Sequence, residues 1–287
     1  MTAAAATVGM PRATTAGRTP PGARLALATL VAIAVAALAA PFLAPGAGEA
    51  LDLAARRAPP SLAHWFGTDE LGRDVMARVL VGARISLAIA LLSAGLAVSL
   101  GSAIGAAAGF VGGWVDATLM RVTDAMLAIP RLPFLMIVAA ILQPSIPLLI
   151  VLVGGVGWME TARVVRAEVL SLATRGFVEA ARATGVPAPR VLARHVLPNV
   201  TGTVAVSATL AVGRGILMES ALSFFGVGVQ PPAASWGTML YQAQTTLGSE
   251  PWLAIFPGMA IFVTVLCVNV LGEQVSGADA GGIGGGQ

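Results

Sequence analysis

The chain alternates long apolar stretches with short segments that hold most of its charged residues. A membrane-spanning helix needs about 20 mostly apolar residues, because the hydrocarbon core of a bilayer is about 30 Å thick. Six stretches fit or approach this length: 25–43, 85–110, 126–142, 147–159 with an extension to 165, 200–227 and 252–271. The pattern therefore predicts an all-α, polytopic membrane protein with six transmembrane helices.

The polar segments divide the chain further. Residues 1–23 are rich in Ala, Thr, Gly and Pro and are expected to form a disordered tail. Residues 24–84 hold the first span and an outer loop, and residues 85–272 form a core of five spans with a polar loop at 175–199. Residues 273–287 end in glycines and are expected to be a flexible tail. The first apolar run is longer than the core of a signal peptide, which favours a retained span.

Composition excludes several classes of protein. The chain is 56% hydrophobic and 11% charged, whereas soluble domains carry roughly 25% charged residues. Its isoelectric point of about 10.3 would suit a nucleic-acid binder, but its mean hydropathy of +0.84 indicates contact with membrane lipid and no nucleic acid. All 17 basic residues are arginines. Without lysine the chain lacks the residue that a phosphate-binding P-loop requires, so ATP would have to bind another protein.

The sequence shows no catalytic or metal-binding constellation. No nucleophile stands in a pattern with a base, and the chain is expected not to be an enzyme. His64 and His195 fall on opposite sides of the predicted membrane, whereas a zinc site needs three or four converging ligands. Cys267 is the only cysteine and cannot form an intrachain disulfide. No metal or cofactor is therefore expected in this chain.

The distribution of arginines predicts the orientation in the membrane. If the N-terminus lies inside, eleven arginines fall in inner segments, five fall in outer segments and Arg214 lies within the fifth span. Basic residues accumulate on the cytoplasmic side of membrane proteins. The N-terminus, the polar loop and the C-terminus are therefore expected to face the cytoplasm.

The polar loop has the pattern of two short helices joined by a turn. Glu179, Ala180 and Ala181 fit one helical turn, and Gly185 can end that helix in the left-handed conformation. Two prolines follow closely, after which a second helix is expected at 190–196. Pro198 is expected to break that helix before the fifth span. Such a compact hairpin suits a cleft in another protein.

This loop resembles the EAA loop of importer permeases in the ABC transporter superfamily. The residues that carry the resemblance are Glu179, Ala180, Ala181, Arg182, Gly185, Leu197 and Pro198. Other segments resemble the dipeptide/oligopeptide and nickel branch of that family, namely 64–75, 82–87, 112–116, 223–232, 235–237 and 251–258. Together they cover residues 60–272 and indicate the second of two permease subunits. The chain departs from the branch at Leu271-Gly272-Glu273, where an aspartate is usual.

The resemblance implies a fold, a function and a set of partners. It implies the type I ABC importer permease fold in the cytoplasmic (inner) membrane of a bacterium. The chain would pair with a homologous second permease subunit, with two ABC ATPase subunits that carry ATP and Mg, and with an extracytoplasmic solute-binding protein. The cargo would be peptides or similar small solutes. The seven loop residues named above would dock onto the ATPase.

Two charged residues and three glycines within the spans leave alternatives open. Arg214 and Glu219 either line the translocation path or a subunit interface, or else Arg214 extends toward the membrane surface while Glu219 pairs with a neighbouring helix. Their spacing of five does not favour a bond between them. Gly101, Gly105 and Gly109 form a flat ridge for close helix packing, within the chain or across a dimer.

Two other functions compete with the importer. An ion-coupled secondary transporter would need ionisable residues within several spans, but only the fifth span carries such residues near its middle. A structural or signalling membrane protein would need no ATPase partner. Neither function accounts for the polar loop.

Overall fold

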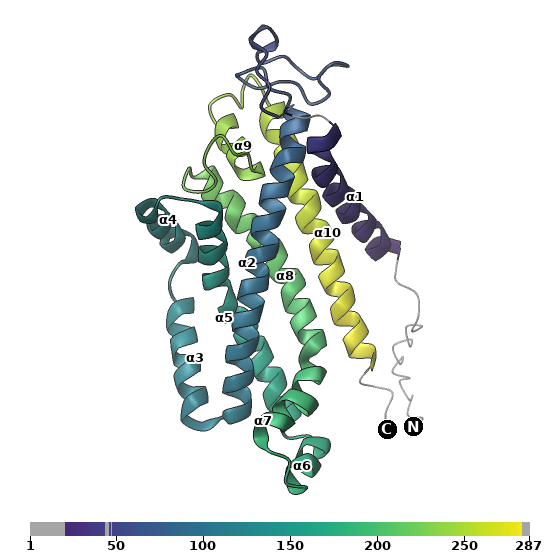
Figure 1. Cartoon of the computed structure of the whole chain (residues 1–287), viewed down its shortest axis with the longest axis vertical. Helices are drawn as coiled ribbons and strands as arrows, with labels where there is room; N and C mark the ends of the chain where they lie inside the picture. The colour runs from purple at the N-terminus through teal and green to yellow at the C-terminus, as the bar shows by residue number, and fades with distance from the viewer. Residues whose placement is uncertain (1–20, 44–45, 47, 283–287) are drawn as a thin grey trace, which may run out of the picture.

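The computed structural model describes residues 21–43, 46 and 48–282. Helices run along one long axis of the molecule, and the short helices α6 and α7 lie at the end opposite α9 (Figure 1). The helices are α1 (Pro21–Leu43), α2 (Val75–Val111), α3 (Gly113–Leu127), α4 (Arg131–Leu142), α5 (Ile146–Ala173), α6 (Gly176–Ala183), α7 (Ala188–Val191), α8 (Leu197–Phe224), α9 (Trp236–Ala243) and α10 (Trp252–Gly282). A 3-10 turn spans Leu53–Ala55, and a π-helical turn spans Leu192–Val196.

Within the described residues, the predicted all-α fold with six spans is confirmed. Five helices are long and apolar enough to cross a membrane, namely α1, α2, α5, α10 and the continuous unit Ala188–Phe224. The pair α3 and α4, bent by 81°, makes a sixth when the two helices are taken as one broken span. It begins at Gly113, whereas the expected stretch began at residue 126. The bend falls at Pro130, which disfavours helical geometry in the residue before it and stands at the N-cap of α4.

Several helix ends differ from the sequence-based boundaries. α2 begins at Val75, ten residues before the expected start, because the Asp74 side chain caps it by accepting a 2.9 Å hydrogen bond from the Ala77 amide. α5 extends to Ala173, and α10 extends to Gly282 through part of the tail expected to be flexible. α1 begins at Pro21, and residues 1–20 of the expected N-terminal tail lie outside the described residues.

The glycine ridge of α2 packs against α5 within the chain, which resolves one of the open alternatives. A Cβ atom on Gly105 would lie 2.4 Å from the carbonyl oxygen of Ala162, and one on Gly101 would lie 2.5 Å from that of Trp158. Gly109 is similarly close to Arg166. These distances are too short for any side chain, so the backbones of the two helices touch. α2 and α5 form the most extensive helix pair in the described structure.

Ion pairs fasten α3 to α5 beside this helix pair. Arg166 forms a two-pronged bond with Asp116, in which its Nη2 atom lies 2.6 Å from Oδ2. Arg163 pairs with Asp124. Guanidinium and carboxylate groups match in such a fork, which fixes orientation as well as distance. The first half of the bent span is therefore held to α5 by charge.

Candidate functional site

The segment expected to dock onto a partner forms a hairpin at one end of the bundle (Figure 1). Its first helix, α6, is seated by side chains that point into the molecule. Val178 is fully buried, and Ala181 is 9% exposed. Both pack in a cluster with Val165, Val169, Leu172, Val191, Val196 and Val200. Ala181, one of the seven residues expected to dock, therefore faces the bundle and seats the hairpin on it.

The turn after α6 is fixed by backbone hydrogen bonds. Gly185 has a φ of +79°, which confirms the expected left-handed conformation. The Val186 amide donates to the Ala181 carbonyl at 3.2 Å, and the Gly185 amide donates to the Arg182 carbonyl at 3.0 Å. This pair of bonds is the Schellman motif, which satisfies the last carbonyls of a helix. The direction in which the chain leaves α6 is thus set locally.

The expected break at Pro198 was wrong. Pro198 stands in the first turn of α8, and the chain is helical from Ala188 to Phe224. The π turn just before it accounts for the continuity, because the Leu197 amide bonds to the Leu192 carbonyl five residues back. A proline lacks an amide hydrogen and crowds the preceding turn, and the wider π turn accommodates both effects. The hairpin is consequently continuous with the fifth span.

The outward face of the hairpin carries several arginines, one acidic residue and the exposed side chain of Phe177. Glu179 and Ala180 are exposed on α6. The exposed arginines of this region are Arg175, Arg182, Arg190 and Arg194. The Arg182 guanidinium also lies 5.3 Å from the centre of the Phe110 ring at the end of α2. Glu179 is thus a single acidic group among cations, on a surface that is rigid because its inner side is packed.

Glu219 lies in a closed network of hydroxyl groups. Its side chain is fully buried. Ser86 of α2 donates to Oε2 at 3.0 Å, and Ser223 donates to Oε1 at 2.8 Å. Those two hydroxyls in turn accept from the amides of Trp236 and Val229, each at 3.1 Å. The carboxylate therefore joins α2, α8 and the loop before α9, which favours pairing with a neighbouring helix over a place on the path.

We expect the Glu219→Ala variant to lose stability. It would leave buried hydroxyl groups without their acceptor, at a cost of about 2 to 4 kcal/mol for the pair. The apparent melting temperature in detergent should fall by roughly 4 to 16 °C, at about 2 to 4 °C per kcal/mol for a chain of this size. Glu219→Gln is the matched control and should fall much less, because the amide oxygen still accepts. Equal losses in the two variants would contradict the network.

Arg214 is part of a charged cluster that joins three helices. It pairs with Glu160 of α5, and Glu160 also accepts a bond from the Nη2 atom of Arg131 at 2.8 Å. All three side chains are partly exposed. Glu160 lies near the midpoint of the 28-residue α5, about 21 Å from its first residue at 1.5 Å per residue. Arg214 thus meets a carboxylate near the middle of α5, and Arg131, the first residue of α4, joins the same cluster.

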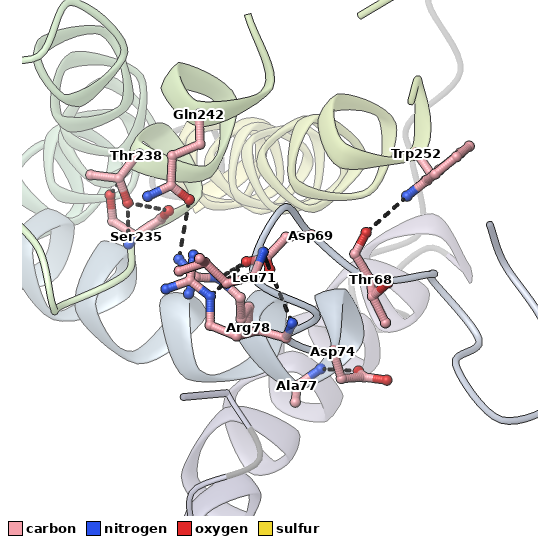
Figure 2. A network of polar contacts seen from close by, with 11 residues as sticks. Thr68, Asp69, Leu71, Asp74, Ala77, Arg78, Ser235, Thr238, Gln242 and Trp252 are labelled. Atoms are coloured by element: carbon pink, nitrogen blue, oxygen red, sulfur yellow. Dashed lines mark hydrogen bonds and ion pairs between the residues drawn. The ribbon is translucent and has the colours of Figure 1, made fainter. Parts of the chain in front are cut away.

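The outer segments are tied together by a second network (Figure 2). Asp69 accepts bonds from the amides of Leu71 and Arg73, and its Oδ2 atom lies 3.6 Å from Nε of Arg78. Arg78 is nearly buried and donates to Gln242 of α9 at 3.2 Å. The segment around Asp69 and Arg73 is a turn, closed by a bridge between residues 68 and 74. These contacts give the outer loop a defined shape against α9.

The fold is that of a polytopic membrane protein with a packed hairpin at one end of its bundle, and the comparisons with known proteins place it in a class of permeases. Residues 101–276 match the family described as binding-protein-dependent transport system inner membrane component. The chain is 40% identical over 254 residues to a putative peptide permease protein of Brucella suis biovar 1, covering 88% of this chain and 84% of the relative. It is 41% identical over 254 residues, with the same coverage, to an oligopeptide transport system permease protein of Escherichia coli K12. It is 43% identical over 219 residues to a glutathione transport system permease protein of Shigella flexneri serotype 5b, covering 76% and 72%.

The chain belongs to the family of inner membrane components of binding-protein-dependent transport systems. It is a multi-pass permease subunit of an ABC importer and is not itself an enzyme. An importer of this kind works with an ATPase and a solute-binding protein. The family match includes the whole hairpin and both candidate residues of α8.

Sequence reasoning missed the partners of Arg214 and Glu219. A neighbouring helix was one of the alternatives for Glu219, but no partner residue was named for either side chain; the partners are Ser86 of α2 for Glu219 and Glu160 of α5 for Arg214. A signal for Glu160 was present, since it is an acidic residue inside the extension of an apolar stretch. A charge in a span must meet a partner or water, so two opposite charges in two spans suggested a pair. Ser86 gave no such signal.

Proposed function

We propose that this chain is one of two homologous permease subunits in an importer of peptides or similar small solutes of the bacterial inner membrane. Two ABC ATPase subunits would bind ATP and Mg on the cytoplasmic side, and a solute-binding protein would deliver cargo to the outer side. Both termini and the α6–α7 hairpin would face the cytoplasm. The cargo class follows the printed names of the relatives, which are a peptide, an oligopeptide and a glutathione permease protein.

The docking role of the hairpin rests on one observation. The hairpin exposes acidic and basic side chains on its outer side, and its inner side is packed on the bundle. Its second helix continues without interruption into α8. The docking knob, meaning the exposed end of the hairpin, would consist of Glu179, Ala180, Arg182 and Gly185. Its shape would be set by Ala181, Leu197 and Pro198. Closure of the ATPase dimer would move the knob, and the continuous helix would carry that movement to Arg214 and Glu219. The outer loop and α9 would face the binding protein.

Reconstitution tests the proposal. Proteoliposomes would contain this chain, its sister permease, the ATPase subunits and the binding protein, with a mixture of tri- and tetrapeptides as cargo. We expect accumulation that needs ATP and stops when the ATPase is left out. Accumulation driven by a proton or sodium gradient without the ATPase would contradict the proposal and favour an ion-coupled transporter. If the assembly hydrolyses ATP but takes up no peptide, only the proposed class of cargo would be overturned.

A further inference from the structure

A cavity of mixed character lies beside the charged cluster of α4, α5 and α8. Its volume is about 440 Å³, and Val164, Val206 and Leu210 line it together with six polar or charged residues. The polar and charged residues are Glu160, Thr161, Thr203, Ser207, Arg214 and Ser276. Thr203 and Ser207 are four residues apart and Arg214 follows seven residues later, so the three share one face of α8. A second, smaller cavity of about 40 Å³ lies against Arg131 and Arg214.

The charges around the cavity do not cancel. Two guanidinium groups meet one carboxylate, which leaves one positive charge in the cluster. Each of the three side chains keeps between 22% and 41% of its surface exposed. A net charge at the middle of a span is costly in lipid, so it has to face water or a further anionic group.

A buried hydroxyl beside the cavity has no partner. Thr161 is 1% exposed and is among the residues that line the cavity, and its Oγ1 atom has no hydrogen-bond partner among the described residues. Buried polar atoms without a partner are uncommon in folded proteins. The side chain of Thr161 packs against Gly101 of α2, so this hydroxyl is buried next to the charged cluster and the charge excess carries the argument.

We propose that this cavity binds the carboxylate of the cargo as it crosses the membrane, with Arg214 as the anion-binding group and with Arg131, which lines the smaller cavity, supplying the second positive charge of the cluster. This inference rests on the proposed function, because it takes peptides as the cargo. A guanidinium group matches a carboxylate in a two-pronged bond. Glu160 neutralises part of the positive charge and keeps the bound carboxylate from being held too tightly, since passage requires both entry and release. The importer would therefore select cargo with a free carboxyl group in the membrane as well as at the binding protein.

Charged thiol reagents test the electrostatics of the cavity in the assembled transporter. Thr203→Cys would be introduced together with Cys267→Ala, so that the cavity carries the only cysteine of this chain. We expect an anionic methanethiosulfonate reagent to modify it faster than a cationic one, relative to their rates with a free thiol. Arg214→Gln should lower this preference by roughly threefold or more and Glu160→Gln should raise it, because each changes the local charge by one unit. Arg214→Lys retains the charge and should retain the preference.

Arg214→Gln and Glu160→Gln are expected to change the preference for the anionic reagent in opposite directions, which distinguishes an anion-binding role from a purely structural one. A salt bridge that only holds the helices together would make Arg214→Gln and Glu160→Gln alike in every readout, including the melting temperature. A mixture of tri- and tetrapeptides should slow the modification, and the same peptides as C-terminal amides should not. Equal protection by the amides would overturn the inference. So would absence of modification in the assembled transporter, because the cavity would then be filled by lipid or by a carboxylate of the sister subunit.

Uptake measured on the same preparation distinguishes the two proposals. One outcome is ATP-dependent peptide uptake together with a preference for the anionic reagent that neither Arg214→Gln nor Glu160→Gln changes. That outcome would overturn the carboxylate site and leave the proposed function standing. Absence of uptake of either peptide mixture by the unmodified assembly would overturn peptide import and, with it, the assignment of the cargo. If the unaltered assembly takes up free peptides faster than their amides, and Arg214→Gln reduces that difference, both peptide import and the carboxylate site would be supported.

Discussion

The Glu179→Arg variant is expected to lose binding to the ATPase and, with it, ATP-dependent uptake. Glu179 is the one acidic residue on an exposed hairpin surface with four arginines. Reversing its charge removes an attraction and adds a repulsion against whatever basic group of the partner meets it. Breaking a charge pair that is buried on binding costs about 2 to 5 kcal/mol, so affinity should fall by a factor of roughly 30 or more. Co-purification of the ATPase with the permease, followed by uptake, measures the effect.

A matched charge reversal controls for the change in net charge. Glu273 is exposed on α10 and lies outside the hairpin. Glu273→Arg should leave co-purification of the ATPase unchanged. The melting temperature of Glu179→Arg should also remain near that of the unaltered chain, because Glu179 takes no part in the packed cluster under α6. Retained ATPase binding with unchanged uptake in Glu179→Arg would rule out the hairpin as the docking site.

Gly105→Leu is expected to be the most damaging single substitution in the bundle. Even its first side-chain carbon would lie 2.4 Å from the Ala162 carbonyl oxygen, so α2 and α5 would have to separate. Overpacking of this kind costs about 3 kcal/mol or more, which corresponds to a fall of roughly 6 to 12 °C in the melting temperature. The yield of folded protein in the membrane should fall as well. Melting in detergent and size-exclusion profiles would record both effects.

Gly95 provides the control on the same helix. A Cβ atom on Gly95 would meet nothing within 4 Å. Gly95→Leu should therefore be neutral or slightly stabilising, because leucine favours the helix more than glycine does. If the two leucine variants melt at the same temperature, the close contact between α2 and α5 does not contribute to stability.

Features with a local physical cause could be predicted from the sequence. The spans follow from apolar length, the bend between α3 and α4 follows from Pro130, and the turn after α6 follows from Gly185. Features that depend on distant residues could not. The buried Arg78 extends α2 beyond its apolar stretch through Asp69, and a π turn removes the break expected at Pro198. Glu160 and Ser86 became partners of α8 only when the helices packed.

The continuous helix from Ala188 to Phe224 has a consequence for the outer face. Its 37 residues would extend about 55 Å at 1.5 Å per residue. One end belongs to the hairpin, and near the other Glu219 is bonded through Ser223 to the amide of Val229. Coupling between two binding events is reciprocal. If nucleotide binding at one end of this helix changes the affinity for a protein that docks at the other end, docking of that protein changes the affinity for nucleotide by the same factor. Docking of a cargo-loaded solute-binding protein should therefore raise the affinity of the ATPase subunits for nucleotide, although the two proteins do not touch.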